Sequence, residues 1–247
     1  MNFLVNQILL IGEQLKFLIR HPSQLRQRIW ILRKFKVIHK NVTCVHSEAE
    51  LLHIADEILT IPLKGDIIEC GVYKGGGTCK LSIIAKLTGK KLYACDSFKG
   101  LPKPSKIDEK HTQLNGTKRI YHEGDYLGTI DEVHQNLVRY GELGVVELVP
   151  GWFDETLPRI RGKKFSLVFI DVDLQGSIIT CIENLWPSLQ KGGKFFTHEA
   201  HHLLTIKAFT DKAFWKQKLG VTTPKFFGAG KGISKTKPCL GYLLKSD

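Results

Sequence analysis

Paired cysteines and long apolar runs are both missing from this 247-residue sequence, and each absence excludes a class of protein. The six cysteines stand singly, without a C-x-x-C pair, so we expect neither a zinc knuckle nor a disulfide framework. No apolar run is long enough to span a bilayer, and the first residues lack the basic start and cleavage site of a secretory signal. These absences predict a cytoplasmic protein with reduced thiols.

Acidic residues are also scarce relative to basic ones. The sequence has 36 Lys and Arg residues against 24 Asp and Glu residues, which gives a formal net charge of +12. Such an excess indicates an anionic partner, such as nucleic acid, a membrane surface or a phosphorylated substrate, or else simple solubility charge. The excess of Lys and Arg falls in residues 16–40 and 207–245, whereas basic and acidic residues are nearly balanced in the central part of the sequence. No aromatic-interleaved basic motif or RNA-binding module is present, so nucleic acid is not the expected partner.

The N-terminal segment has the periodicity of an amphipathic helix. Leu4, Ile8, Ile11, Leu15 and Leu18 recur at spacings of three and four residues, and a basic segment follows them. Such a helix could lie on a membrane surface, but we expect it to pack on the rest of the chain or on a second subunit. We assign residues 1–47 to an N-terminal helical extension and residues 48–247 to one main domain.

From residue 47 onward, predicted helices alternate with predicted strands. The helices cover residues 47–59, 78–87, 129–141, 177–190 and 203–219; the strands cover 66–70, 91–96, 145–149, 164–173 and 194–197, with a strand pair in 225–245. This order predicts a Rossmann-like α/β fold, with a mostly parallel sheet, helices on both faces and an antiparallel C-terminal strand. A long polar loop at 102–125 could be a mobile lid.

A glycine-rich turn joins the first strand of the main domain to the next helix. Its sequence from Glu69 to Thr78 is not G-x-G-x-x-G and has no Lys-Ser/Thr after the glycines, so a dinucleotide fingerprint and a P-loop are both excluded. An acid just before the first glycine is typical of turns that bind S-adenosylmethionine (SAM). Asp96 ends the next strand, where a carboxylate can accept ribose hydroxyls. Together they predict a SAM site.

Several strings resemble the macrocin O-methyltransferase family over residues 48–220: E-C-G-V-x-x-G-G, D-S-F-x-G-L-P, G-W-F-D-E-T-L-P and I-D-x-D-L. The resemblance implies a class I methyltransferase fold, a sugar or glycan hydroxyl on a small molecule as acceptor, and a homodimer. It also implies a set of cofactor-binding residues. Those around the methionine part of SAM are Glu69, Gly71, Gly75 and Gly76; Asp96 holds the ribose, and Ser97, Gly151 and Trp152 lie near the adenine.

The acids that the family uses for catalysis are only partly present. An alcohol is a poor nucleophile until it loses its proton, and related enzymes use a divalent cation with a carboxylate base. The family takes its metal from the first acid of I-D-x-D-L, here Asp171, and from an Asp-Asp pair after the next strand. His198 and Glu199 occupy the positions of that pair. Mg²⁺ prefers oxygen ligands, whereas imidazole suits transition metals.

Three interpretations follow for a site in which Asp171 and His198 are the catalytic candidates. A divalent metal, Mg²⁺ or a transition ion, could bind through Asp171, His198 and Glu199. Alternatively, a histidine could act as general base without a metal, or the protein could bind its ligand without transferring a methyl group.

An RNA methyltransferase is the alternative suggested by the net charge. The string H-E-x-x-H at 198–202 does not indicate a zinc protease, because it follows a strand and a Gly-Gly turn rather than lying inside a helix.

Overall fold

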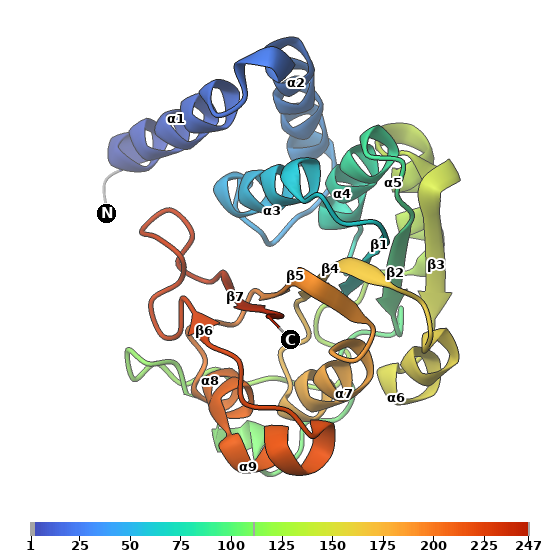
Figure 1. The fold of residues 1–247 in the computed structure, drawn as a ribbon, viewed down its shortest axis with the longest axis vertical. Coiled ribbons are helices and arrows are strands. Elements are labelled where there is room, and N and C mark those ends of the chain that lie inside the picture. Colours follow the sequence, from blue (N-terminus) through green and yellow to red (C-terminus); the bar gives the residue numbers. More distant parts are fainter. Residues whose placement is uncertain (1–2, 111, 247) are drawn as a thin grey trace.

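The strands form one seven-stranded sheet in the computed structural model, which describes residues 3–110 and 112–246. The order is β3-β2-β1-β4-β5-β7-β6; the first five strands are parallel and the last two antiparallel (Figure 1). Their bounds are β1 Asp66–Cys70, β2 Leu92–Asp96, β3 Val146–Pro150, β4 Phe165–Ile170, β5 Leu189–Thr197, β6 Phe226–Phe227 and β7 Gly241–Leu244. Every residue of β4 is buried, as expected for a central parallel strand covered on both faces. The predicted fold class is confirmed.

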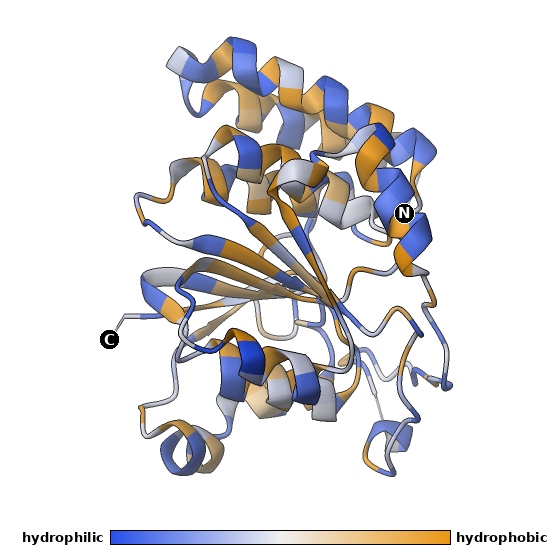
Figure 2. Ribbon diagram, turned by 90° about the vertical axis from the view of Figure 1, so that its right-hand side faces the viewer, coloured by the Kyte–Doolittle hydropathy of each residue, from blue (hydrophilic) through white to orange (hydrophobic). Residues whose placement is uncertain are grey.

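Helices cover both faces of the sheet (Figure 2). The core therefore consists of two apolar clusters, which the sheet separates. One cluster lies under α1 to α5, and the other lies under α6 to α8. The bounds are α1 Phe3–Ile19, α2 Leu25–Asn41, α3 Glu48–Thr60, α4 Gly76–Leu87, α5 Ile130–Tyr140, α6 Phe153–Thr156, α7 Gln175–Leu185, α8 Leu203–Thr210 and α9 Lys212–Phe214. Short 3₁₀ turns occupy Pro22–Gln24, Asp108–Lys110, Leu143–Val145 and Leu157–Ile160.

The N-terminal extension is built into the same core, although not through the predicted stripe. Phe17 of α1 and Phe35 of α2 are buried in the first cluster, and the buried guanidinium of Arg28 lies 2.6 Å from Asp56 of α3. Ile8, Ile11 and Leu15 are instead exposed, so this part of the stripe does not pack on the chain. The side chain of Leu4 lies outside the described residues. Among the helices that the structure describes, none is both long and apolar enough to cross a membrane.

The predicted continuous helix over 203–219 is wrong, because the chain leaves helical geometry at Asp211. That residue has φ −70° and ψ 99°, and its carboxylate accepts hydrogen bonds from the backbone N–H groups of Ala213 and Phe214 at 2.9 and 3.1 Å. An aspartate that caps a new helix competes with continuation of the old one. The segment therefore divides into α8, α9 and a π-helical turn at Trp215–Leu219.

The predicted helix over 177–190 is too long by one turn. It ends at Leu185, and β5 begins at Leu189 and runs through the Gly192–Gly193 turn signal. Gly192 takes a positive φ of 83° within this strand, so the glycine pair marks an irregularity in the strand instead of its start. The predicted loop over 102–125 contains the short turn at Asp108–Lys110 and an antiparallel pairing of Gln113 with His202.

Candidate functional site

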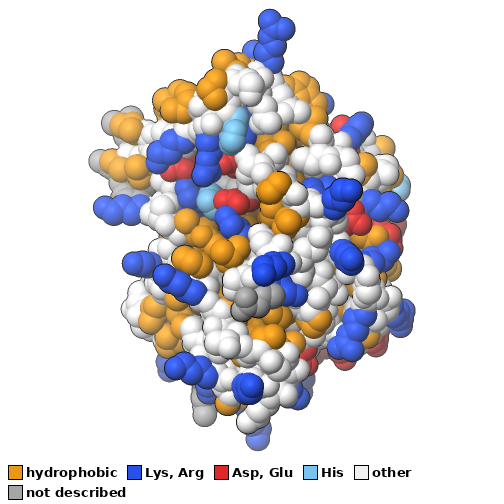
Figure 3. Space-filling view, in the orientation of Figure 1, with side chains coloured by type: hydrophobic (Ala, Val, Ile, Leu, Met, Phe, Trp, Pro, Cys, Tyr) orange, Lys and Arg blue, Asp and Glu red, His pale blue; other side chains and the backbone are white. Residues whose placement is uncertain are grey.

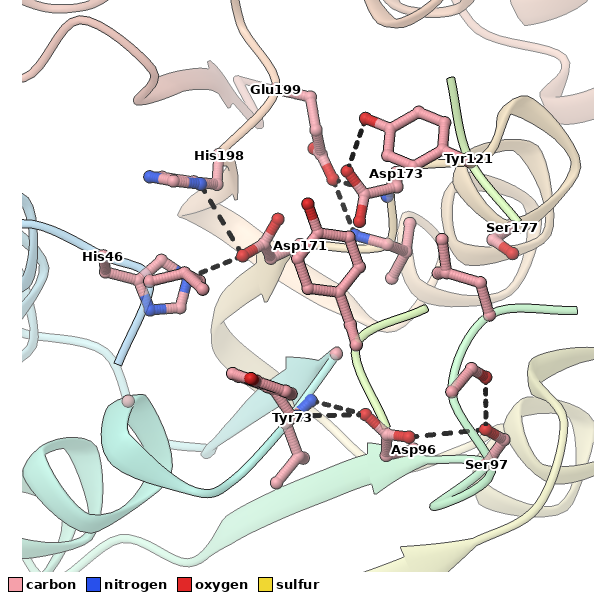
Figure 4. Close-up of a pocket in the computed structure, with 18 of the residues that line it drawn as sticks. His46, Tyr73, Asp96, Ser97, Tyr121, Asp171, Asp173, Ser177, His198 and Glu199 are labelled. Carbon is pink, nitrogen blue, oxygen red and sulfur yellow. Dashed lines mark hydrogen bonds and ion pairs between the residues drawn. The ribbon is translucent and has the colours of Figure 1, made fainter. Parts of the chain in front are cut away.

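A cavity of about 360 Å³ opens where β1, β2, β4 and β5 end (Figure 4). In open parallel sheets, ligands bind at the carboxyl ends of the strands. Two groups of side chains face each other across this cavity, and we name them by their strands. The β1–β2 wall consists of Gly71, Val72, Tyr73, Gly76, Asp96 and Ser97; the β4–β5 wall consists of His46, Asp171, Asp173, His198 and Glu199.

The β1–β2 wall is shaped by backbone geometry. Gly71 has a φ of 92°, and a Cβ at this position would lie 1.9 Å from the carbonyl oxygen of Asp171, so only glycine fits. Asp96 ties the turn to the neighbouring strand. One of its carboxylate oxygens accepts the backbone N–H groups of Val72 at 2.7 Å and Tyr73 at 3.3 Å, and the other accepts that of Phe98 at 2.8 Å. Burial raises the pKa of Asp96, although these hydrogen bonds oppose the shift.

The predicted cofactor-binding residues do not all line the cavity. Those on its surface are Gly71, Gly76, Asp96, Ser97, Gly151 and Trp152. Glu69 and Gly75 lie behind it. The carboxyl group of Glu69 is buried beneath the first turn of α4, where a Cβ on Gly77 would come within 2.7 Å of Oε1. Burial raises the pKa of Glu69 to about 8. Gly75 is the N-cap residue of α4 and takes a left-handed φ of 82°.

The β4–β5 wall is shaped by charged side chains. Asp171 directly follows β4 and His198 directly follows β5, and the register pairs the preceding residues Ile170 and Thr197. The two side chains therefore lie side by side, with His198 Nδ1 at 3.6 Å from Asp171 Oδ2. His46 Nε2 lies 2.8 Å from the same oxygen, and His198 Nε2 lies 3.1 Å from Glu50 Oε2. Acid and imidazole thus alternate along Glu50, His198, Asp171 and His46.

The alternation strongly shifts the pKa values of its members. Burial alone would lower the pKa of His46, but hydrogen bonds with Asp171 and Cys44 raise it to about 9. Burial likewise opposes a charged Asp171, yet His198 and His46 hold the pKa of that carboxyl well below its usual range. Glu50 is also buried, and its contacts with His198 and Ser47 lower its pKa to about 2. With both histidines protonated, the four side chains form a network of ion pairs in which His46 and Glu50 are buried, while Asp171 and His198 are each 14% exposed.

Glu199 has a different environment from His198, because successive residues at the end of a strand point to opposite sides. Its Oε1 accepts the backbone N–H groups of Val172 at 2.6 Å and Asp173 at 2.9 Å, and its Oε2 accepts the hydroxyl of Thr197. Oε1 therefore holds the loop after β4, whereas Oε2 is bonded to the last residue of β5. This loop contains Asp173 at a φ of 56°, a left-handed conformation that is uncommon outside glycine.

Asp173 points into the cavity beside Tyr121, which comes from the loop over 102–125. The Tyr121 hydroxyl donates a hydrogen bond to Asp173 Oδ1 at 2.7 Å. Burial, together with the nearby charges of Asp171 and Glu199, raises the pKa of Asp173 to about 8. The loop that the sequence indicated as a lid thus reaches the β4–β5 wall.

Three groups of side chains in the described residues bring possible metal ligands within 4.8 Å of one another: His46, Asp171 and His198; Glu50, His198 and Cys239; and Asp171, Asp173 and Glu199. The predicted set of Asp171, His198 and Glu199 is not one of them, since His198 and Glu199 belong to different groups. In the all-oxygen group, Oε1 of Glu199 already accepts two backbone N–H groups of the loop after β4, and Oε2 accepts the Thr197 hydroxyl. The first group offers two imidazoles and one carboxylate, a donor set for a transition metal.

Sequence reasoning missed His46 and Glu50. They contact their partners in the β4–β5 wall across 125 and 148 residues of sequence, respectively. The local pattern around them, Ser47-x-x-Glu50, predicts the start of a helix, and the structure has that capping box at α3. Nothing in the pattern indicates that the same glutamate also reaches a histidine after β5.

Comparisons with known proteins agree with this architecture. The family model for macrocin-O-methyltransferase (TylF) matches residues 41–225. A tetracenomycin-C rhamnosyl 4'-O-methyltransferase from Streptomyces olivaceus is 29% identical over 147 residues, which cover 58% of this chain and 56% of the relative. The mycinamicin III 3''-O-methyltransferase from Micromonospora griseorubida is 27% identical over 147 residues, 58% of each chain. The chain thus matches little more than half the length of these curated relatives.

Among solved structures, the O-methyltransferase NovP superposes with a TM-score of 0.64 at 20% sequence identity, and the match covers 80% of this chain and 79% of NovP. At that level of identity the similarity concerns the fold. The family model, in contrast, spans most of the chain, including the glycine-rich turn, Asp96, Asp171 and His198. The chain belongs to the macrocin O-methyltransferase family.

Proposed function

We propose that this protein transfers a methyl group from SAM to a hydroxyl group of a small molecule, with a sugar or glycan as the acceptor. The observation that carries the proposal is one cavity with a glycine turn and Asp96 on one wall and Asp171 between two histidines on the other. Family membership supports it, and so do two relatives named for the methylation of sugar positions.

SAM would lie against the β1–β2 wall. Gly71 and Gly76 would surround its methionine part, Asp96 would accept the ribose hydroxyls, and Ser97, Gly151 and Trp152 would lie near the adenine. A carboxylate offers about four acceptor positions, so Asp96 can hold the turn and still accept from a ribose. Glu69 and Gly75 would act from behind the wall. Glu69 lies under the N-terminus of α4, and Gly75 provides the conformation that starts this helix.

The acceptor would lie against the β4–β5 wall. The methyl group moves from the sulfonium sulfur to the hydroxyl oxygen, the sulfur keeps the electron pair of the broken bond, and the hydroxyl proton must leave. Asp171 and His198 are already paired with neighbours, so they would position the reacting hydroxyl. Asp173 faces the cavity, and its Oδ1 accepts the hydrogen bond of Tyr121. Its Oδ2 is therefore better placed than Asp171 or His198 to accept the proton of the reacting hydroxyl.

Calorimetric titration with S-adenosylhomocysteine, followed by a transfer assay with radiolabelled SAM and a panel of sugar acceptors, tests the proposal. We expect micromolar binding that is lost in Asp96→Ala. We expect Asp171→Asn to bind the cofactor normally and to lose methyl transfer, whereas Asp131→Asn, on the exposed surface of α5, serves as the control for both assays. Absence of cofactor binding by the unmodified protein would refute the proposal.

A further inference from the structure

We propose that His46, Asp171 and His198 together bind a divalent transition-metal ion of the Zn²⁺, Co²⁺ and Fe²⁺ class in preference to Mg²⁺. The proposal deepens the proposed function, because the ion would lie in the same cavity. Its binding can nevertheless be measured without any methyl transfer. One of the three ligands, His46, comes from outside the motifs that define the family resemblance.

The spacing of the three side chains suits a single ion. His46 Nε2 lies 2.8 Å and His198 Nδ1 lies 3.6 Å from the same oxygen of Asp171, and all three ligand atoms lie within 4.8 Å of one another. Ligand atoms at ~2.1 Å from a tetrahedral ion are ~3.4 Å apart, so only small side-chain movements would admit the metal. The imidazole rings lie edge to face with centroids 4.7 Å apart, so their nitrogens approach the carboxylate from two directions.

Each histidine is held with the required nitrogen toward Asp171. With His198 Nε2 hydrogen-bonded to Glu50 Oε2, Nδ1 faces Asp171, and loss of its proton would free it to bind an ion. A carboxylate behind a histidine is the usual outer partner of a metal-bound imidazole. Glu50 is fixed in turn by the backbone N–H and hydroxyl of Ser47, at 3.0 and 2.8 Å. His46 is buried, with its ring 5.0 Å from that of Phe169.

The donor set also accounts for the loss of the family's Asp-Asp pair. Replacing one acid by His198 brings in a nitrogen donor, and His46 adds a second. Glu199, at the second position of that pair, does not belong to this ligand group and instead accepts hydrogen bonds from the loop after β4. Two imidazoles and a carboxylate favour transition ions over Mg²⁺, which demands an octahedral shell of oxygens.

The test is metal titration of protein first stripped with a chelator, using Co²⁺, Zn²⁺ and Mg²⁺ separately. We expect one equivalent of Co²⁺ to bind with visible absorption bands of a nitrogen-ligated ion, and Zn²⁺ to displace it. Mg²⁺ should bind at least 100-fold more weakly. His46→Gln should weaken Co²⁺ binding at least 100-fold, and Glu50→Gln by roughly 10- to 100-fold. The matched control is His201→Gln, which changes a cavity histidine outside all three ligand groups.

Equal affinity for Mg²⁺ and Co²⁺, no binding of either, or Co²⁺ binding that survives His46→Gln would overturn the metal proposal. Titration of the same samples with S-adenosylhomocysteine separates the two proposals. Cofactor binding without metal binding removes only the metal, whereas metal binding without cofactor binding removes only the methyltransferase function.

A separate observation, on the outer surface of the extension, carries a second inference: we propose that α1 and α2 lie on an anionic lipid surface. One face of α1 presents large aliphatic side chains at spacings of three and four residues, and they are between 42% and 68% exposed. They are Val5, Ile8, Ile11, Leu15 and Ile19. A continuous apolar helix face of this kind marks an interaction surface, and a helix lying in the plane of a membrane presents such a face.

The charge of the extension indicates what covers this face. No Asp or Glu occurs from residue 14 to residue 47. The side chains of Arg26, Arg33, Lys34, Lys36 and Lys40 of α2 are exposed, and within residues 3–110 and 112–246 no carboxylate pairs with any of them. Trp30 is exposed between them, with Lys34 over its ring. Figure 3 shows basic and apolar side chains interspersed over the end of the molecule that carries α1.

Anionic headgroups match this surface better than a second copy of the chain does. Basic residues beside an apolar helix face attract acidic lipids, and each Lys or Arg near the membrane surface strengthens the binding. A twofold dimer would bring the same basic faces together, and the one acid of the extension, Glu13, is already paired with Lys16 and Lys237.

Flotation with vesicles of neutral lipid, with and without anionic phosphatidylglycerol, tests this inference. We expect binding only to the anionic vesicles. Binding should be lost in Ile8→Ser/Ile19→Ser and at least tenfold weaker in Arg33→Gln/Lys34→Gln/Lys36→Gln. The charge-matched control, Lys191→Gln/Lys216→Gln/Lys235→Gln, changes exposed lysines elsewhere and should bind normally. Equal binding to neutral vesicles would overturn the inference. So would a dimer by light scattering that Ile8→Ser/Ile19→Ser dissociates, because a second copy would then cover the face.

Discussion

The two walls of the cavity are built in different ways. The β1–β2 wall comes from a short stretch of chain, residues 71–97, and is held by glycine conformations and by backbone N–H groups on Asp96. The β4–β5 wall brings together segments that are 125 and 148 residues apart, and it is held by charged side chains. The first wall therefore depends on backbone shape and the second on charge balance. Substitutions should have different consequences on the two sides.

The largest effect is expected where the two walls touch, at Gly71. In Gly71→Ala the new Cβ would lie 1.9 Å from the carbonyl oxygen of Asp171, at a φ of 92° that alanine rarely adopts. We expect a loss of about 3 kcal/mol or more in the free energy of unfolding, measured by urea denaturation. Gly176→Ala is the control, because no atom lies within 4 Å of its Cβ and it lies in α7. Equal stability of the two variants would mean that the walls are not in contact at Gly71.

The second effect should appear on the β4–β5 wall alone. Glu50→Gln removes the charge behind His198 while leaving the cavity surface unchanged, because Glu50 does not line it. We expect methyl transfer to fall roughly 10- to 100-fold, with unchanged affinity for S-adenosylhomocysteine. Glu123→Gln, on an exposed loop, should change neither quantity. A parallel loss of cofactor affinity would show that the walls are not independent.

A smaller effect is expected at the contact between the 102–125 loop and the β4–β5 wall. Tyr121→Phe removes the hydroxyl that donates to Asp173 at 2.7 Å. One hydrogen bond contributes about 1 kcal/mol, so the rate of transfer should fall about fivefold. Steady-state kinetics would measure this change, and an unchanged rate would mean that the loop does not position Asp173.

The smallest effect on stability is expected at an ion pair that attaches the N-terminal extension to the C-terminal part of the chain. His46 lies at the end of this extension. Burial would raise the pKa of Glu13 in α1, but hydrogen bonds from Lys237 at 2.6 Å and Lys16 at 3.0 Å lower it to about 2. A carboxyl with a lowered folded-state pKa stabilises the protein fully above its unfolded pKa, and this stabilisation disappears as the pH falls toward 2. Urea denaturation should therefore find Glu13→Gln less stable at pH 6, with a smaller difference at pH 3. A difference independent of pH would exclude this ion pair as its cause.

The sequence predicts the β1–β2 wall much better than the β4–β5 wall. Glu69, the glycines and Asp96 stand at the ends of neighbouring strands, and local spacing is enough to place them together. The pairing of Asp171 with His198 also follows from the order of the strands. The approach of His46 depends on how the extension packs over α3 and α4, and no local pattern encodes that packing.

Two features of the fold were beyond sequence patterns for similar reasons. Periodicity detects an apolar stripe on α1 but does not tell which side of the helix meets the protein, and Phe17 provides a competing inner face. The break at Asp211 depends on one carboxylate that caps the next turn, and a continuous helical period obscured it.

The order of acid and imidazole along Glu50, His198, Asp171 and His46 has a consequence for how such a site can evolve or be engineered. Restoring an aspartate at position 198 alone would place it between two existing carboxylates, Glu50 and Asp171, and would leave His46 as the one imidazole among the four side chains. That single step toward an all-acid site therefore passes through a protein with unbalanced charge at the cavity. The four positions are expected to change as a set, and a graft of this site onto a relative must carry the segment before α3 together with the ends of β4 and β5.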